Sequence, residues 1–108
     1  MNKVIRDGKV AILYSPGFGS GWYSWSGNKD HPPMLYDPTL VKWVESGKPK
    51  TDWDRLCATL KEKYPDIYLG GLKDLDIRWV PVDTRFYIDE YAGYETVVLE
   101  HEVQWEVA

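Results

Sequence analysis

The segment from Ser15 to Tyr36 most restricts how this chain can fold, because it shows neither helical nor strand periodicity. It follows residues 9–15, where alternating, β-branched residues predict a strand that is apolar on both faces. Such long segments without secondary structure are uncommon in small domains and are often functional. This loop is therefore the first candidate for a binding site.

The rest of the chain predicts two helices and then a series of strands. A short helix begins at Asp37–Pro38 and ends at Gly47, and a second helix covers residues 52–64, with Thr51 and Asp54 as a capping box. Strands are expected at residues 67–69, 77–80, 86–91, 95–100 and 103–107, with a hairpin turn at Ala92–Gly93. This order predicts a single α+β domain over residues 1–108, with a mainly antiparallel sheet of about five strands and two helices packed on one face.

Composition excludes several classes of function. The 13 Lys and Arg residues are scattered and the net charge is −4, so we expect no duplex nucleic acid as a partner. A single cysteine, Cys57, offers neither a disulfide nor a zinc cluster, and its place on an apolar helix stripe predicts a core residue. No apolar run is long enough for a membrane helix or a signal peptide, which predicts a cytoplasmic protein without a membrane partner. No cofactor is expected.

Glycine and serine give the loop a possible role in anion binding. Gly17, Gly19 and Gly21 alternate, and glycines at this spacing let successive backbone amides form a nest for a phosphate or a carboxylate. The hydroxyls of Ser15 and Ser20 could add donors. The segment lacks the Lys-Ser/Thr pair of a Walker loop, so the pattern indicates an anion site without naming a family.

Aromatic content is high, with six Trp and eight Tyr, which suggests that some rings face a ligand or another chain. In the loop, Trp22 and Trp25 could stack on a nucleobase next to Phe18. Arg78 and Arg85 could supply the positive charge for such a ligand. The alternative interpretation is structural: the three rings fill the core, and both arginines form solvent-facing ion pairs.

Evidence for catalysis or a metal site is weak. His31 lies in a proline-rich loop and His101 lies between two glutamates, and neither belongs to a nucleophile or metal motif. We therefore expect no enzymatic activity, no catalytic residue and no metal; a small hydrolase using His31 remains an alternative. The acidic residues near the C-terminus could be a protein-binding face or an ordinary solvated one. These residues are Glu95, Glu100, Glu102 and Glu106.

Residues 10–25 resemble the opening of a family of small uncharacterised phage and prophage proteins, with a Tyr-Ser-Pro-Gly-Phe-Gly-x-Gly-Trp-Tyr-Ser-Trp motif. Residues 68–71, 76–81 and 86–91 are similar to later parts of the same family. The resemblance implies no particular catalytic residues. Small phage proteins often counter host immunity, and one class, the sponges, binds cyclic nucleotides or ADP-ribose derivatives in pockets between the subunits of symmetric oligomers.

The function predicted on this basis is sequestration of a small, cyclic nucleotide immune signal by a homo-oligomeric phage protein in the host cytoplasm, without cleavage. The alternative is an inhibitor that binds a host defence protein, such as a CRISPR effector, through an acidic or aromatic surface. The predicted ligand-binding residues are Ser15, Gly17, Phe18, Gly19, Ser20, Gly21, Trp22, Trp25, Arg78 and Arg85.

Overall fold

A computed structural model describes residues 3–19, 21–26 and 32–108 of the chain. Its strands are β1 (Ile5–Arg6), β2 (Lys9–Tyr14), β3 (Asp76–Pro81), β4 (Phe86–Tyr91) and β5 (Tyr94–Leu99). Its α-helices are α1 (Pro38–Glu45) and α2 (Trp53–Lys63), and its 3-10 turns are η1 (Pro32–Tyr36), η2 (Lys50–Asp52), η3 (Leu72–Asp74) and η4 (Glu100–Glu102). The predicted α+β class is confirmed.

The strands form two antiparallel sheets, whereas the sequence predicted one sheet of about five strands. In the first sheet β2 lies between β1 and β3, and its pairing with β3 runs from Lys9 opposite Pro81 to Tyr14 opposite Asp76. In the second sheet β4 pairs with β5. The division follows from β2, which is apolar on both faces: a second sheet covers one of these faces instead of extending the first sheet at its edge.

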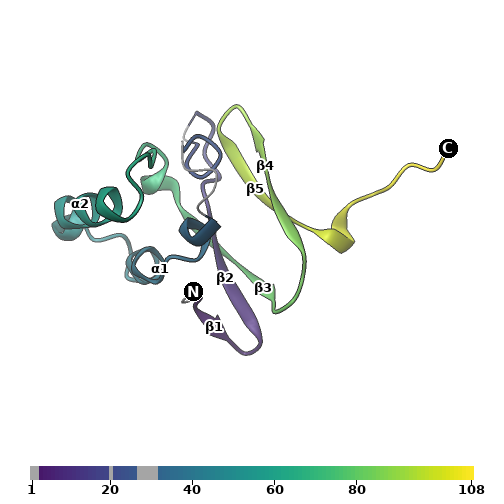
Figure 1. The fold of residues 1–108 in the computed structure, drawn as a ribbon, viewed down its shortest axis with the longest axis horizontal. Coiled ribbons are helices and arrows are strands. Elements are labelled where there is room, and N and C mark those ends of the chain that lie inside the picture. Colours follow the sequence, from purple (N-terminus) through teal and green to yellow (C-terminus); the bar gives the residue numbers. More distant parts are fainter. Residues whose placement is uncertain (1–2, 20, 27–31) are drawn as a thin grey trace.

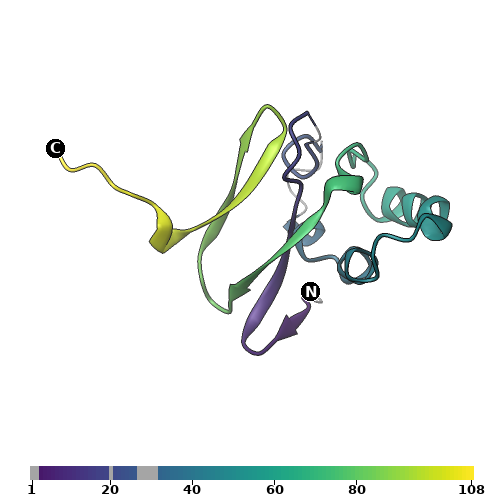
Figure 2. The ribbon, with the colours of Figure 1, turned by 180° about the vertical axis from the view of Figure 1, so that it is seen from behind.

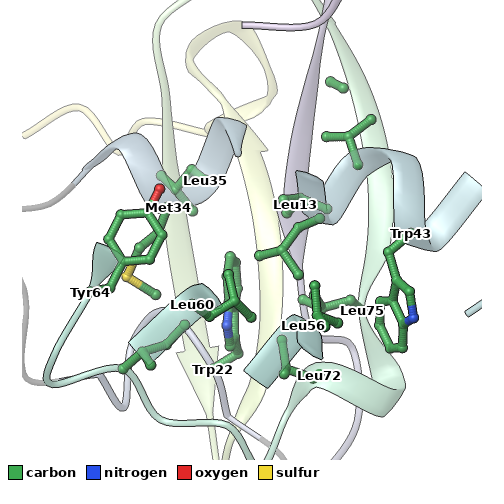
Figure 3. Close-up of a cluster of buried hydrophobic side chains, with 14 residues drawn as sticks. Leu13, Trp22, Met34, Leu35, Trp43, Leu56, Leu60, Tyr64, Leu72 and Leu75 are labelled. Atoms are coloured by element: carbon green, nitrogen blue, oxygen red, sulfur yellow. The ribbon is translucent and has the colours of Figure 1, made fainter. Parts of the chain in front are cut away.

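Residues of β2 contribute to two apolar clusters on opposite faces. Leu13 belongs to a cluster with Leu40 of α1 and Leu60 of α2, part of which is drawn in Figure 3. Ile12 belongs to a second cluster with Val97 of β5. In Figure 1 the helices accordingly lie on one side of β2 and β3, and the β4–β5 hairpin lies on the other. The central strand thus ties the helical part to the hairpin.

Helix α1 begins where the sequence predicted, at Pro38 with Asp37 as its N-cap. The buried Asp37 carboxylate accepts hydrogen bonds from the backbone N–H of Thr39, at 2.8 Å, and of Leu40, at 3.2 Å. Its second oxygen accepts the hydroxyl of Tyr64 at 2.7 Å, just past the end of α2. Burial and this hydrogen bond raise the pKa of Tyr64 well above its ordinary value. One carboxylate therefore caps α1 and fixes the end of α2.

Two hairpins have turns in which both central residues adopt positive φ. The predicted turn at Ala92–Gly93 is confirmed, with φ of 50° and 85°. The other turn, Asp7–Gly8, joins β1 to β2 with φ of 52° and 73°, and strand β1 was not predicted. Mirror-image turns of this kind suit the right-handed twist of paired strands.

Three local predictions were wrong. Residues 67–69 are not a strand, since the backbone N–H of Tyr68 donates to the hydroxyl of Ser26 at 3.1 Å. The capping box at Thr51 does not form, because η2 occupies this position and no side chain caps α2. Residues 103–108 form no strand and extend away from the body of the protein at the end opposite the helices, as Figures 1 and 2 both show.

Candidate functional site

The glycine-aromatic loop, residues 15–26, is held by the carboxylate of Glu95 in β5. This side chain is fully buried. One of its oxygens accepts the backbone N–H of Ser15 at 3.0 Å, and the other accepts those of Trp22 at 3.3 Å and Ser24 at 2.7 Å. The Ser24 hydroxyl donates to the same oxygen at 2.7 Å, and the backbone N–H of Glu95 donates to the carbonyl of Ser15 at 2.8 Å. Glu95 thereby joins both ends of the loop to the second sheet.

This arrangement differs from the predicted nest, which was to use the amides near Gly17, Gly19 and Gly21. The donors of Ser15, Trp22 and Ser24 surround a carboxylate of the protein itself, so they are not available to a phosphate. The prediction that Glu95 belongs to a solvated acidic face was wrong. A signal was present in the sequence: Glu95, Val97 and Leu99 alternate on one face of β5, and all three are buried.

Two of the predicted loop glycines, Gly19 and Gly21, lie where the loop packs closely against the turn at Ala92–Gly93. The N–H of Gly19 donates to the carbonyl of Ala92 at 2.6 Å. A Cβ on Gly93 would lie 2.9 Å from the backbone nitrogen of Gly21, and a Cβ on Gly21 would lie 2.5 Å from the Trp25 ring. Gly17 is half-buried in the same loop, and Ser20 lies outside the described residues. Gly19 and Gly21 therefore fit a packing role.

The three loop aromatics have different environments. Trp22 is fully buried in the core, as the structural interpretation predicted. Phe18 is 70% exposed, with its ring centroid 4.9 Å from that of Tyr94. Trp25 is 41% exposed, and its indole N–H donates to Glu90 at 2.7 Å. Phe18 and Trp25 therefore leave ring surface open beside the hairpin turn, whereas Trp22 does not.

Neither predicted arginine faces the loop. Arg78 on β3 donates to the carbonyl of Val97 at 2.6 Å and pairs with Glu102 at 2.7 Å. This ion pair, with the backbone N–H of Leu99, lowers the pKa of Glu102 to about 2. Arg85 pairs with Glu100 at 3.5 Å, at the end of the hairpin away from its turn. Both arginines therefore form the ion pairs of the alternative, structural interpretation.

The remaining candidate residues are two histidines and the single cysteine. His31 lies outside the described residues, and His101 is exposed in η4. Cys57 is half-buried, and burial raises the pKa of its thiol. Within residues 3–19, 21–26 and 32–108, no three His, Cys, Asp or Glu side chains are grouped to hold a metal ion. In the same ranges, no helix reaches the length and apolarity needed to cross a bilayer.

A second candidate site lies among the helices, where the sequence indicated none. It is an open cleft of about 510 Å³. The side chains that line it are Trp43, Lys48, Lys50, Trp53 and Lys73. Its volume lies within the usual range for small-molecule sites, about 300–1,000 Å³. We call it the tryptophan–lysine cleft.

The two indoles of this cleft come from different helices. Trp43 of α1 is nearly buried, and its N–H donates to the carbonyl of Pro49 at 3.2 Å. Trp53, the first residue of α2, is half-buried, and the two ring centroids are 5.8 Å apart with the planes inclined by 48°. Of the two indoles, Trp53 therefore exposes more of its surface to solvent than Trp43.

The lysines enter the cleft from three short connecting segments. Lys48 adopts φ of 56° just after α1 ends, and its ammonium donates to the carbonyl of Lys73 at 2.8 Å. Lys73 of η3 places its ammonium 5.7 Å from the centroid of the Trp53 ring. Lys50 is the exposed first residue of η2. Three positive charges thus surround an aromatic face, and no acidic side chain is among the described residues that line it.

Sequence reasoning missed this cleft because its residues are far apart and follow no motif. Lys48 and Lys73 are 25 positions apart and meet only because η3 packs next to the end of α1.

Compared with protein-family profiles, curated proteins and solved structures, the chain shows no significant similarity to any of them.

Proposed function

We propose that this protein binds a small nucleotide-like ligand without cleaving it, and that the ligand occupies the tryptophan–lysine cleft. The observation that carries this proposal is that three lysines line the cleft together with the indole pair of Trp43 and Trp53. A nucleotide offers the matching chemistry, because its base can stack on an indole while its phosphates attract ammonium groups.

The proposal moves the predicted site from the loop to the helices. In the loop, the amides of Ser15, Trp22 and Ser24 donate to Glu95, and the amide of Gly19 donates to the carbonyl of Ala92. Both predicted arginines are paired elsewhere. In the cleft, Lys50 is exposed, and Trp53 has an open face. Sequestration of an immune signal in a host cytoplasm, implied by the resemblance to phage proteins, is part of the proposal.

The test is native mass spectrometry with a panel of cyclic dinucleotides and ADP-ribose isomers, followed by titration calorimetry of any ligand that binds. Trp53→Leu should weaken binding by about tenfold or more, since stacking on an aromatic ring contributes about 1–3 kcal/mol per base. Lys50→Gln and Lys73→Gln should each weaken it as well. The ligand should be recovered unmodified after incubation.

Trp25→Leu is the matched control, because it removes an exposed indole from the loop. It should leave affinity unchanged. If Trp25→Leu abolishes binding and Trp53→Leu does not, the loop is the site and the cleft assignment is wrong. If no nucleotide in the panel binds to the wild-type protein, the proposed function fails.

A second candidate function is binding to a host protein, favoured by the aromatic surface beside the hairpin turn. Phe18 and Tyr91 are 70% and 75% exposed. The ring centroid of Phe18 lies 6.3 Å from that of Tyr91 and 4.9 Å from that of Tyr94. Exposed aromatic clusters are typical of protein-binding surfaces. If this function is the correct one, the wild type should bind no nucleotide. The double variant Phe18→Ala with Tyr91→Ala should then no longer capture the partner protein that the wild type captures.

A further inference from the structure

The C-terminal tail, residues 103–108, carries two large apolar side chains that are exposed to solvent. Trp105 is 78% exposed and Val107 is 92% exposed. Figures 1 and 2 show that the tail projects away from both sheets. Tryptophan is enriched, with tyrosine and arginine, among the residues that contribute most binding energy at protein interfaces.

The tail also lies in the most acidic part of the chain. From residue 86 to residue 108 the sequence has six Asp and Glu residues and no Lys or Arg. Glu95 is buried and Glu102 is paired with Arg78, which leaves Glu106 beside Trp105 as an exposed acidic group of the tail. The tail therefore presents an indole next to a carboxylate.

The tryptophan–lysine cleft has the complementary chemistry. It offers the face of Trp53, with the ammonium group of Lys73 near its ring, and the exposed Lys50. An indole can stack on Trp53 and contact a lysine through a cation–π interaction, while a neighbouring carboxylate pairs with another lysine. Charge and ring chemistry thus match between the tail and the cleft.

A chain cannot place its tail in its own cleft. The tail and the helices lie at opposite ends of the molecule, whose longest extent is 52 Å. Six extended residues span at most roughly 20 Å. Any such contact must therefore join two copies.

We propose that Trp105 and Glu106 of one copy bind in the tryptophan–lysine cleft of a second copy. Each copy then gives its tail to one neighbour and accepts the tail of another, a head-to-tail contact that forms a closed ring or an open chain. Because it uses the cleft assigned above to a nucleotide, the tail competes with that ligand. The tail contact does not itself require nucleotide binding.

The test uses two variants of the 108-residue chain. The tail variant carries Trp105→Ala and Glu106→Lys and keeps an intact cleft, and the cleft variant carries Lys50→Glu and Lys73→Glu and keeps an intact tail. In analytical ultracentrifugation we expect the wild type to self-associate as its concentration rises and each variant alone to remain a monomer. Mixed together, the two variants should form a dimer of twice the 12.6 kDa of one chain and nothing larger.

A third variant, Tyr91→Ala with Asp89→Lys, removes an exposed ring and an exposed acid from β4. It should self-associate as the wild type does. Circular dichroism checks that every variant is folded. A wild type that stays monomeric, a cleft variant that associates normally, or a mixture that contains only monomers would each overturn the proposal.

The same variants separate this inference from the proposed function. The tail variant leaves the cleft open, so it should bind a nucleotide at least as tightly as the wild type. If the mixed dimer forms but the tail variant binds no nucleotide, the tail contact stands and the nucleotide function fails. If the tail variant binds a nucleotide but no mixed dimer forms, only the tail proposal fails.

Discussion

At the scale of single residues, Glu95 determines how the glycine-aromatic loop is held. Its buried carboxylate accepts hydrogen bonds from three backbone amides and one hydroxyl. Glu95→Gln keeps the shape of the side chain but removes the charge and places an amide N–H₂ against backbone donors. We expect the free energy of unfolding to fall by about 2–4 kcal/mol, because hydrogen bonds to a charged group are strong and buried donors would lose their acceptor.

Chemical denaturation of Glu95→Gln and of Glu62→Gln provides the comparison. Glu62 is exposed on α2, so its replacement should change stability by no more than about 0.5 kcal/mol. Equal effects of the two substitutions would show that the Glu95 carboxylate does not hold the loop.

The role of Glu95 shows what residue-level sequence reasoning could and could not reach. The glycines predicted an anion held by the amides of residues 17–21, whereas the amides of Ser15, Trp22 and Ser24 hold the carboxylate of Glu95. The partners are separated by up to 80 positions and meet through the pairing of the loop with β5. Patterns within a short window do not record such long-range contacts.

At the scale of elements, the β4–β5 hairpin was predicted from its local sequence, whereas the β1–β2 hairpin, whose turn at Asp7–Gly8 is equally local, was missed. The Ala92–Gly93 turn and both helices lie where expected, because turn chemistry, the Asp37 cap and helical periodicity act over a few residues. The division into two sheets was not predicted, since β-strand patterns do not say which strand pairs with which. Residues 103–107 alternate like a strand but have no neighbouring strand in the described chain.

The two hairpin turns offer a matched comparison. Gly8 and Gly93 both have positive φ, of 73° and 85°, but a Cβ on Gly8 meets nothing within 4 Å, whereas one on Gly93 meets the loop backbone at 2.9 Å. Gly8→Ala should cost about 1–2 kcal/mol from backbone strain alone. Gly93→Ala should cost clearly more and should loosen the loop, which hydrogen exchange of the Gly19 amide can detect. Equal losses of stability would contradict the close packing of loop and turn.

At the scale of the whole molecule, the two sheets are joined by apolar packing and by Arg78. Its guanidinium reaches from β3 to the carbonyl of Val97 on β5 and to Glu102 in η4. The hydrogen bonds from Arg78 and from the backbone of Leu99 lower the pKa of Glu102 to about 2 in the folded protein. This link therefore depends on the protonation state of one carboxylate.

The sign of the pH effect follows from that lowered pKa. The stabilisation is fully present above the ordinary pKa of about 4.5 and is lost as pH falls towards 2, because the unfolded chain binds the proton first. Wild type should exceed Glu102→Gln in stability at pH 6, and this difference should shrink steadily between pH 4.5 and pH 2. Urea denaturation across this range measures it. As a control, the difference in stability between wild type and Glu62→Gln should not shrink in this way. If the difference between wild type and Glu102→Gln stayed constant with pH, the Arg78–Glu102 pair would not help to join the sheets.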